Sequence, residues 1–413
     1  MKFLLIAPGW TKLPEQTNFN LPPLGPIQVA AAAPDDVEVR IVNENVQPVD
    51  LEADCDLVGL SVLLSCQAPR AYELAHEFRQ RGKPVVLGGL HVTLCPEEAA
   101  GHADAVVLGE GEGLIGPMVA DFRQGRPRKV YAHSDYPDIA KVPSPRRALY
   151  DKSAHYSYKG LEMVDLVETS RGCRFNCYPC CVPYLGGRRH RIKPWDLVAQ
   201  DLASCSNLIF IVDNSLEQNK EYERSLCRNL AGLKKHWISH PITPDPELLG
   251  LARESGCWYV YHAIFDISDK IRDRIKLYHD HGIAVEGTVL LGLDNHTEDF
   301  ILRLIDFLQE IELDLAEFTV LTPFPRTQAW KQLNDENRIF DRDWKNYNAA
   351  TVVYRPRLMS PDKLQELYYR AWREFYGRES QSWRMTKLYL KVIRDLPRPR
   401  RKAGQAAGTA EPR

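Results

Sequence analysis

The stretch Arg171-Gly172-Cys173-Arg174-Phe175-Asn176-Cys177-Tyr178-Pro179-Cys180 decides how the rest of the chain is interpreted. It spaces three cysteines as C-x3-C-x2-C, just after an apolar run at residues 163–167. Cysteine thiolates hold iron–sulfur clusters, and four of them complete an ordinary cluster. Three thiolates leave one iron open to another ligand. The pattern therefore indicates a reactive iron–sulfur site, rather than a structural one, at the end of a buried strand.

Two other interpretations of these cysteines stay open. A structural zinc site needs four ligands, and Cys181 or His190 could supply the fourth. Zinc sites usually combine two C-x2-C units, however, and the sequence has no second unit. A disulfide pair is also conceivable, although ten cysteines without a secretory signal favour a reducing compartment. The spacing favours the open-iron cluster.

The motif resembles that of the radical S-adenosylmethionine (SAM) enzymes. In that family three cysteines hold a [4Fe–4S] cluster and SAM binds the fourth iron. An electron from the cluster then splits SAM into methionine and a 5′-deoxyadenosyl radical. The resemblance implies that Cys173, Cys177 and Cys180 are the cluster ligands. Two details depart from the family: Pro179 stands where an aromatic residue is usual, and Cys181 is an additional neighbour that we interpret as a bystander.

Length and composition set the limits for the rest of the chain. The 413 residues have room for two or three domains. A net charge of −2 provides no general attraction to nucleic acid or to an anionic membrane. No apolar run reaches the roughly 18 residues of a membrane-spanning helix. The apolar start at residues 3–7 is too short for a signal peptide and predicts a buried strand. We expect a cytoplasmic protein.

Residues 1–125 alternate apolar strand patterns with helical patterns. Strands are expected at residues 3–7, 37–42, 57–64, 84–89 and 105–108, and helices at 69–81 and near 96–100. This alternation predicts a Rossmann-like, doubly wound parallel sheet that binds ligands at the carboxyl ends of its strands. Two of those ends are glycine-rich, at residues 88–91 and 109–113. Either motif alone would be an ordinary tight turn.

Together these motifs resemble the cobalamin-binding domain that is fused to one large group of radical SAM proteins. The similarity includes Leu21-Pro22-Pro23-Leu24-Gly25, Gly88-Gly89-Leu90-His91-Val92-Thr93 and Gly109-Glu110-Gly111-Glu112. It implies that cobalamin is bound by Ser61, Gly88, Gly89, His91, Gly109, Glu110, Gly111 and Glu112. No D-x-H-x-x-G motif is present, so the resemblance implies cobalamin without a protein histidine on cobalt. His91 is equally well explained as a hydrogen-bonded loop histidine. A nucleotide site, a flavin site or an empty scaffold are the alternatives for this domain.

Residues 126–160 are rich in proline and arginine and predict an extended linker, whose basic cluster we expect to be solvated. Strand and helix patterns then resume over residues 161–340. Strands are expected near 163–169, 207–213, 236–239, 257–263, 284–291 and 316–321, with helices near 195–204, 219–235, 245–255, 269–281 and 296–312. Six strands are too few for the usual eight-stranded barrel. A partial (β/α)6 barrel fits them and matches the radical SAM resemblance.

The resemblance also implies a SAM site at the strand ends. Asp213 and Asn214 follow the second strand and are expected to hydrogen-bond SAM, although such residues also open ordinary turns. Gly292 follows the fifth strand and is expected to approach the adenosine closely. The glutamate that relatives carry after the fourth strand is absent, and His262 or Asp266 are possible substitutes. Arg326 could meet an anionic group of the substrate or be simply exposed.

Residues 341–396 are expected to form a helical extension, and residues 397–413 a disordered tail. Ser360-Pro361-Asp362 predicts the start of a helix, and Leu364, Leu367, Tyr368 and Ala371 belong to its apolar face. We expect that face to pack in the core, with lining of a substrate cavity as the alternative.

The resemblance as a whole implies a cobalamin-dependent radical SAM enzyme that methylates an unactivated carbon of a small or lipid-like metabolite. Its cofactors would be a [4Fe–4S] cluster, SAM and cobalamin, and a flavodoxin or ferredoxin would donate electrons. A cyclase or rearrangement enzyme with the same cofactors is the first alternative. The missing glutamate keeps a third one open, a non-catalytic protein that binds iron–sulfur or cobalamin.

Overall fold

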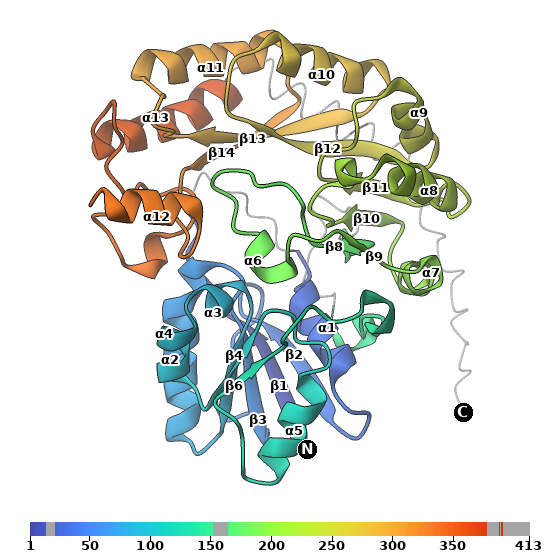
Figure 1. Cartoon of the computed structure of the whole chain (residues 1–413), viewed down its shortest axis with the longest axis vertical. Coiled ribbons are helices and arrows are strands. Elements are labelled where there is room, and N and C mark those ends of the chain that lie inside the picture. Colours follow the sequence, from blue (N-terminus) through green and yellow to red (C-terminus); the bar gives the residue numbers. More distant parts are fainter. Residues whose placement is uncertain (14–20, 152–163, 378–387, 389, 391–413) are drawn as a thin grey trace, which may run out of the picture.

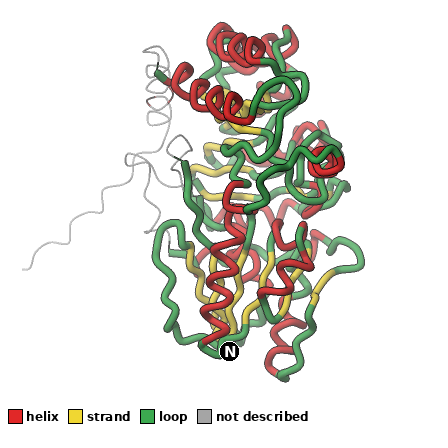
Figure 2. The backbone as a smooth tube through the Cα atoms, turned by 90° about the vertical axis from the view of Figure 1, so that its left-hand side faces the viewer, coloured by secondary structure: helices red, strands yellow, loops and turns green. Residues whose placement is uncertain are grey.

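Two α/β domains are stacked along the long axis of the molecule in the computed structural model (Figures 1 and 2). The structure describes residues 1–13, 21–151, 164–377, 388 and 390. Each domain contains one six-stranded sheet, and every pair of neighbouring strands in these two sheets is parallel. The predicted tail at residues 397–413 lies outside the described residues. No helix in the described part of the chain is long and apolar enough to cross a membrane.

The N-terminal sheet has the strand order β2-β1-β3-β4-β5-β6. Its strands are β1 (Lys2–Ala7), β2 (Glu38–Asn43), β3 (Leu57–Ser61), β4 (Val85–Gly88), β5 (Ala105–Leu108) and β6 (Val130–Ala132). Leu4 and Ile6 enter one buried cluster, whereas Phe3 and Leu5 enter another on the opposite face. Both faces are therefore covered, as the continuous apolar strands predict, and the doubly wound fold is confirmed.

Helices on the two faces of this sheet bury its apolar side chains. These helices are α1 (Leu24–Ala32), α2 (Ala68–Gln80), α3 (Leu90–Leu94), α4 (Pro96–His102) and α5 (Ile115–Arg123). In α2 the spacing of Ala71, Leu74, Ala75 and Phe78 places four fully buried side chains on one face. The chain order reverses between β1 and β3. Ligands of doubly wound sheets bind at such a switch point, beyond the carboxyl ends of the strands.

The second sheet has the order β14-β13-β12-β11-β10-β7, in which each strand pairs with its neighbour along the chain. Its strands are β7 (Asp165–Val167), β10 (Leu208–Ile211), β11 (His236–Ser239), β12 (Cys257–Ile264), β13 (Ala284–Leu291) and β14 (Leu315–Val320). One face packs against the large apolar core formed with the helices, which lie on the outside in Figure 1. The helices are α7 (Trp195–Ala203), α8 (Lys220–Leu230), α9 (Pro246–Glu254), α10 (Asp269–Asp280) and α11 (Glu298–Glu310). This is the predicted partial barrel.

Side-chain caps explain why four of these helices begin where they do. Asn219, Asp245, Ser268 and Thr297 each accept a hydrogen bond from a backbone N–H in the first turn of the helix that follows. Such caps satisfy N–H groups that have no partner within the helix.

The C-terminal part contains α12 (Gln328–Asp335), the short 3-10 turn η7 (Trp344–Asn346) and α13 (Pro361–Tyr376). α13 lies against α11 and β14, and its residues Leu364 and Phe375 are fully buried in the outer core. The Tyr376 hydroxyl donates to the Ala316 carbonyl and accepts from the Ala316 N–H, which covers part of the open edge of β14. The predicted core packing is thus confirmed. The predicted helical extension is confirmed by α13, but it begins later than expected, because residues 341–360 contain only η7.

Two predictions for the linker at residues 126–160 are also wrong. β6 lies within it and adds an edge strand to the first sheet. Only Tyr131 of that strand is buried, so the sequence lacks the apolar run that marks a strand. The basic cluster is not fully solvated either, because Arg147 is buried. Its guanidinium donates to both carboxylate oxygens of Asp201 at 2.7 and 2.8 Å and to the Leu166 carbonyl at 2.6 Å.

We expect Arg147→Met to destabilise the second domain strongly. The substitution leaves the Asp201 carboxylate buried without its ion-pair partner, which typically costs about 3–5 kcal/mol. The thermal midpoint should fall by roughly 6 °C or more. Arg128→Met is the matched control, since Arg128 also pairs with an aspartate but is 58% exposed. Equal midpoints for the two variants in differential scanning calorimetry would contradict this assignment.

Candidate cofactor interface

The three cysteines of the motif lie on one loop between the two domains. Strands β8 (Ser170–Arg171) and β9 (Arg191–Ile192) pair antiparallel and close the base of this loop. We call residues 172–190 the cluster loop; it includes the short helix α6 (Pro183–Gly186). In Figure 1 the cluster loop lies between the barrel and the N-terminal sheet. Helix α6 contacts α3, which follows β4 of the N-terminal sheet.

Hydrogen bonds fix the backbone on both sides of Cys173. The Cys173 N–H donates to the Gly187 carbonyl at 2.9 Å. The buried Gln218 side chain accepts from the Arg174 N–H at 2.8 Å and donates to the Gly172 carbonyl at 3.2 Å. A Cβ on Gly172 would approach the Arg189 carbonyl to 2.2 Å, so only glycine fits before this cysteine. Cys173 is held by its surroundings, whereas Cys177 and Cys180 are exposed.

The donor set of the cluster loop fits an iron–sulfur cluster. All ten cysteines are free thiols, so none of the three is consumed in a disulfide. Burial raises the pKa of Cys173, and the charge of the neighbouring Cys177 thiolate raises it further. A cationic iron–sulfur core would relieve that repulsion between thiolates. Burial raises the pKa of Cys181 to about 12, which agrees with a bystander. In the described ranges, no three His, Cys, Asp or Glu side chains gather around one point as ligands of a single ion do.

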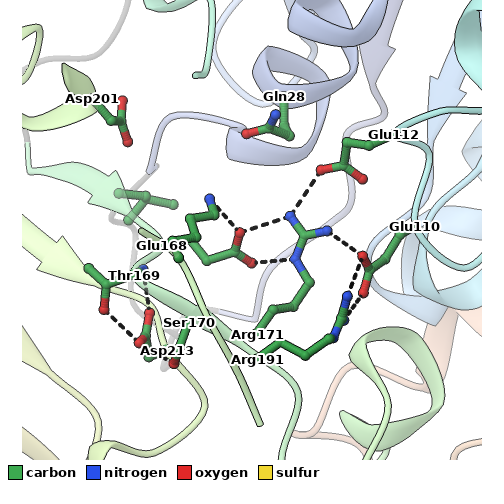
Figure 3. Close-up of polar contacts among 12 residues, drawn as sticks. Gln28, Glu110, Glu112, Glu168, Thr169, Ser170, Arg171, Arg191, Asp201 and Asp213 are labelled. Atoms are coloured by element: carbon green, nitrogen blue, oxygen red, sulfur yellow. Dashed lines mark hydrogen bonds and ion pairs between the residues drawn. The ribbon is translucent and has the colours of Figure 1, made fainter. Parts of the chain in front are cut away.

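Asp213 lies at the carboxyl end of β10 and links it to the segment before the cluster loop. Its carboxylate accepts from the Thr169 N–H and hydroxyl at 2.7 Å each, and from the Ser170 hydroxyl at 2.5 Å (Figure 3). Burial raises the pKa of Asp213 to about 6 although these hydrogen bonds lower it. These contacts connect the end of β10 to the segment that leads into the cluster loop. Asn214, the next residue, is half-buried and stays the predicted SAM contact at this strand end.

Other predicted SAM contacts have partners within the protein. A Cβ on Gly292 would lie 2.3 Å from the Tyr354 hydroxyl, which bonds the Gly292 carbonyl. Its positive φ of 89° and this contact explain the glycine without a cofactor. The His262 ring lies beside Tyr278 of α10, on the helix side of the sheet. His262 is therefore directed away from the inner face of the barrel and cannot replace the missing glutamate. Asp266 accepts from the Ser268 hydroxyl next to the cap of α10.

Arg326 extends from the barrel toward the N-terminal domain. Its guanidinium lies 3.9 Å from Glu97 of α4, and both side chains are exposed. Of the two interpretations of Arg326, simple exposure matches this position.

The switch point of the N-terminal sheet faces the barrel. The segment after β3 contacts η7 of the C-terminal part through the turn at Ser65–Gln67. Ser61 ends β3, and its hydroxyl lies 3.5 Å from where a Cβ on Gly25 would be. The large side chains of Leu63 and Leu64 are exposed just beyond it. Exposed leucines at the ligand-binding edge of such a sheet suit a large apolar ligand like the corrin ring.

The predicted glycines of this domain divide into two groups. A Cβ on Gly109 would meet open space, and its φ of 72° favours glycine, so this residue can approach a ligand. The other three contact protein atoms. A Cβ on Gly89 would lie 2.6 Å from the Val62 carbonyl, Gly88 packs near Val107, and Gly111 packs near Ile115. Gly89 is thus explained by the close approach of the residue after β3, whereas the neighbours of Gly88 on β5 leave an ordinary contact distance.

His91 is fully buried and both of its ring nitrogens are occupied. They lie 3.1 Å from the Tyr72 hydroxyl and 3.1 Å from the Ser65 hydroxyl. Burial lowers the pKa of His91 to about 4, so the ring is neutral at physiological pH. These contacts match the structural alternative given above for His91, and they leave no nitrogen for cobalt.

Glu110 and Glu112 contact arginines of the cluster loop base (Figure 3). Arg171 donates to Glu110 at 2.7 Å, to Glu112 at 2.9 Å and to Glu168 at 2.8 Å. Arg191 also bonds to Glu110, and Lys193 lies 2.8 Å from Glu168. Burial alone would raise the pKa of Glu168, but the charges of Arg171 and Lys193 lower it to about 2. The two glutamates of the Gly-Glu-Gly-Glu motif therefore join the domains.

A second group of polar side chains lies on the inner face of the barrel sheet, opposite the helices. Glu286 on β13 accepts a hydrogen bond from the Tyr259 hydroxyl of β12, and Tyr261 pairs with Glu286 in register. Glu317 on β14 is within electrostatic reach of both Glu286 and Lys12, a residue of the segment after β1. Burial and, to a smaller extent, the charge of Glu317 raise the pKa of Glu286 to about 7, although the Tyr259 hydrogen bond lowers it. Acid–base groups tuned near neutrality are common at functional sites.

Comparisons with known proteins support the same two-part plan. The B12 binding domain family matches residues 15–116. Two relatives come from Chlorobaculum tepidum. Bacteriochlorophyllide d C-8(2)-methyltransferase is 26% identical and covers 84% of each chain. Bacteriochlorophyllide d C-12(1)-methyltransferase is 25% identical over 91% of this chain and 87% of its own.

Among solved structures, the chain is similar to the radical SAM methyltransferase TsrM from Kitasatospora setae with cobalamin and a [4Fe–4S] cluster bound. The TM-score is 0.62 at 16% identity, over 81% of this chain and 75% of that chain. The chain thus has a cobalamin-binding domain followed by a radical SAM-type partial barrel, and the resemblance predicted from the motifs is confirmed. Both relatives are named methyltransferases, and the solved structure is that of a radical SAM methyltransferase with both cofactors bound.

Three structural contributors were missed by the sequence interpretation. Gln218 belongs to a short 3-10 turn that no motif marks. The β8–β9 pair is too short to give an alternating pattern. Glu286 could have been found, because the alternation Ala284-Val285-Glu286-Gly287-Thr288 places a carboxylate among the inward positions of a buried strand.

We expect Gln218→Leu to lower the cluster iron per chain after anaerobic reconstitution, because both peptide groups beside Cys173 lose their side-chain partner. Gln365→Leu is the matched control, since that amide also bridges backbone groups, at Val352 and Ala350. Each substitution should cost about 1–3 kcal/mol of stability. Equal iron content in the two variants would mean that Gln218 does not position Cys173.

Glu286→Gln should become more stable relative to the native protein as the pH rises from 5 to 8. The pKa of Glu286 is raised from 4.5 to about 7, which means that the folded protein favours the neutral carboxyl. This contribution to the free energy of unfolding is fully present below pH 4.5 and is lost as the pH rises through 7. Glutamine does not titrate, and the relative gain should approach on the order of 2–3 kcal/mol. Thermal midpoints at both pH values measure it, with the exposed Glu254→Gln as control. A pH-independent difference would be the contrary result.

Proposed function

We propose that this chain is a cobalamin-dependent radical SAM enzyme that methylates an unactivated carbon of a small or lipid-like metabolite. One observation carries the proposal. The loop with three free thiols and the ligand-binding edge of the B12 binding domain face each other across a single interface, where Arg171 contacts both sides. Methyltransferases among its relatives favour methyl transfer as the reaction.

In this proposal, Cys173, Cys177 and Cys180 hold the [4Fe–4S] cluster, which when bound supplies the electron for SAM cleavage. Gln218 and Gly172 fix the backbone at Cys173. Asp213 fixes the strand ends below it through Thr169 and Ser170. Ser61, Gly109 and the exposed Leu63 and Leu64 form the surface for cobalamin.

The inner face of the barrel is the proposed wall of the substrate site. Tyr259, Tyr261 and Glu286 provide aromatic area together with hydrogen-bonding groups. Such a wall suits a largely apolar molecule that also carries a hydrogen-bond donor. A tetrapyrrole is one member of that class, and it is the substrate named for both relatives. A flavodoxin or ferredoxin in the cytoplasm is the proposed source of electrons.

We expect the anaerobically reconstituted protein to contain about four irons per chain, as a [4Fe–4S] cluster requires. It should bind cobalamin and release 5′-deoxyadenosine when SAM and dithionite are added. Cys177→Ala should abolish deoxyadenosine formation, whereas Cys205→Ala, outside the loop, should not. Iron and cobalamin without SAM cleavage would overturn the enzyme assignment. A cyclised rather than methylated product would keep the cofactors and replace the reaction.

A further inference from the structure

The base of the cluster loop places two arginines side by side. In the antiparallel β8–β9 pair, Arg171 lies directly opposite Arg191. Like charges at directly opposed positions destabilise a strand pair. Two-stranded ribbons are also marginally stable on their own, and each of these strands has only two residues. Without added negative charge, the β8–β9 pair would not close the cluster loop.

Glu168 of the same domain pairs with Arg171, but the carboxylate that touches both arginines comes from the other domain. Glu110 accepts from Arg171 at 2.7 Å and from Arg191 at 3.2 Å, and its second oxygen also bonds Arg191. The Glu110 side chain is 3% exposed, and those of Arg171 and Arg191 are 12% and 10% exposed. Glu112, the next glutamate of the motif, accepts from Arg171 at 2.9 Å. The carboxylate of Glu110 therefore bridges the two opposed arginines in a setting that excludes most of the solvent.

The charges of this group balance. Arg171, Arg191 and Lys193 face Glu110, Glu112 and Glu168. Removing one partner of a buried ion pair leaves an uncompensated buried charge and is strongly destabilising. Loss of Glu110 would leave three cations against two carboxylates at the point where the cluster loop begins and ends.

We propose that Glu110 is a positioning residue for the iron–sulfur site: the cobalamin-binding domain closes the cluster loop by neutralising Arg171 and Arg191. This inference rests on the proposed function, since it takes the three cysteines to hold a cluster. It replaces the predicted contact of Glu110 and Glu112 with cobalamin. It also makes retention of the cluster depend on a residue of the domain that holds the other cofactor.

The test measures iron and sulfide per chain in full-length protein reconstituted anaerobically without cobalamin. Glu110→Gln should lower cluster iron about fivefold or more, because one buried arginine charge is left unpaired. Glu97→Gln is the matched control, since Glu97 also faces an arginine of the barrel but is 87% exposed. That control should keep the native iron content. A native protein without a cluster would refute the proposed function itself.

A charge-balanced variant separates charge from general damage. Glu110→Gln combined with Arg191→Gln removes one charge of each sign, together with the hydrogen bonds that Arg191 donates to the Gly186 and Pro137 carbonyls. This double variant should recover at least about half of the native iron, since no buried charge is left unpaired. A double variant no better than Glu110→Gln would overturn the inference.

Cobalamin binding to the same variants provides the second readout. If Glu110→Gln keeps the native iron content but loses affinity for hydroxocobalamin, Glu110 contacts cobalamin instead, and the inference is overturned. If Glu110→Gln does not fold, Glu112→Gln removes a single bond of the group and leaves Glu110 on both arginines. It should then show an intermediate loss of iron, and unchanged iron in that variant would contradict the inference.

Discussion

Buried charge must be paired, and this constraint fixes how the two domains meet. Arg171 extends from the first strand segment of the barrel into three carboxylates, two of which belong to the N-terminal domain. Isolated buried charges are costly, so Arg171 needs carboxylate partners at this depth, and the N-terminal domain supplies two of the three. These ion pairs therefore favour the arrangement of the two domains in which the Gly-Glu-Gly-Glu segment lies at the base of the cluster loop.

This docking brings two ligand-binding edges together. Parallel sheets bind ligands beyond the carboxyl ends of their strands. In Figure 1 the loop with α6 lies between the barrel sheet and the N-terminal sheet. Cys173 begins its loop two residues after Arg171, and Gly109 precedes Glu110 in the other domain. The same contacts that hold the domains together thus hold the two predicted cofactor loops next to each other. The inner face of the barrel, with Glu286 and Tyr261, completes the enclosure.

The sequence predicted most of the fold because its apolar strand patterns alternate with helical patterns. β12 and β13 appear within one or two residues of their expected bounds, and the helices α8 to α11 begin within two residues of theirs. β6 was not predicted, because an edge strand with one buried residue has no apolar run. Arg147 was misjudged since its proline-rich surroundings are typical of a solvated linker, whereas its partner Asp201 is distant in sequence.

The candidate site was less predictable for the same reason. The cysteine spacing is local and could be read directly, but the partners of Glu110 lie on β8 and β9, far along the chain. Glycines around Glu110 and Glu112 indicate close backbone approach without saying to what, so a cofactor contact and a domain contact look alike in the sequence. Gly292 and His91 show the same ambiguity. The Gly292 carbonyl bonds the Tyr354 hydroxyl and the His91 ring bonds the Tyr72 hydroxyl, so neither residue needs a cofactor contact.

The central claim is that an iron–sulfur cluster and a cobalamin face each other across this interface. Electron paramagnetic resonance of the reduced protein, loaded with both cofactors, tests it most directly, because a reduced [4Fe–4S] cluster and cob(II)alamin each carry an unpaired spin. The account predicts that the two signals broaden or split each other through magnetic coupling. Two independent signals, identical to those of protein loaded with each cofactor alone, would contradict it.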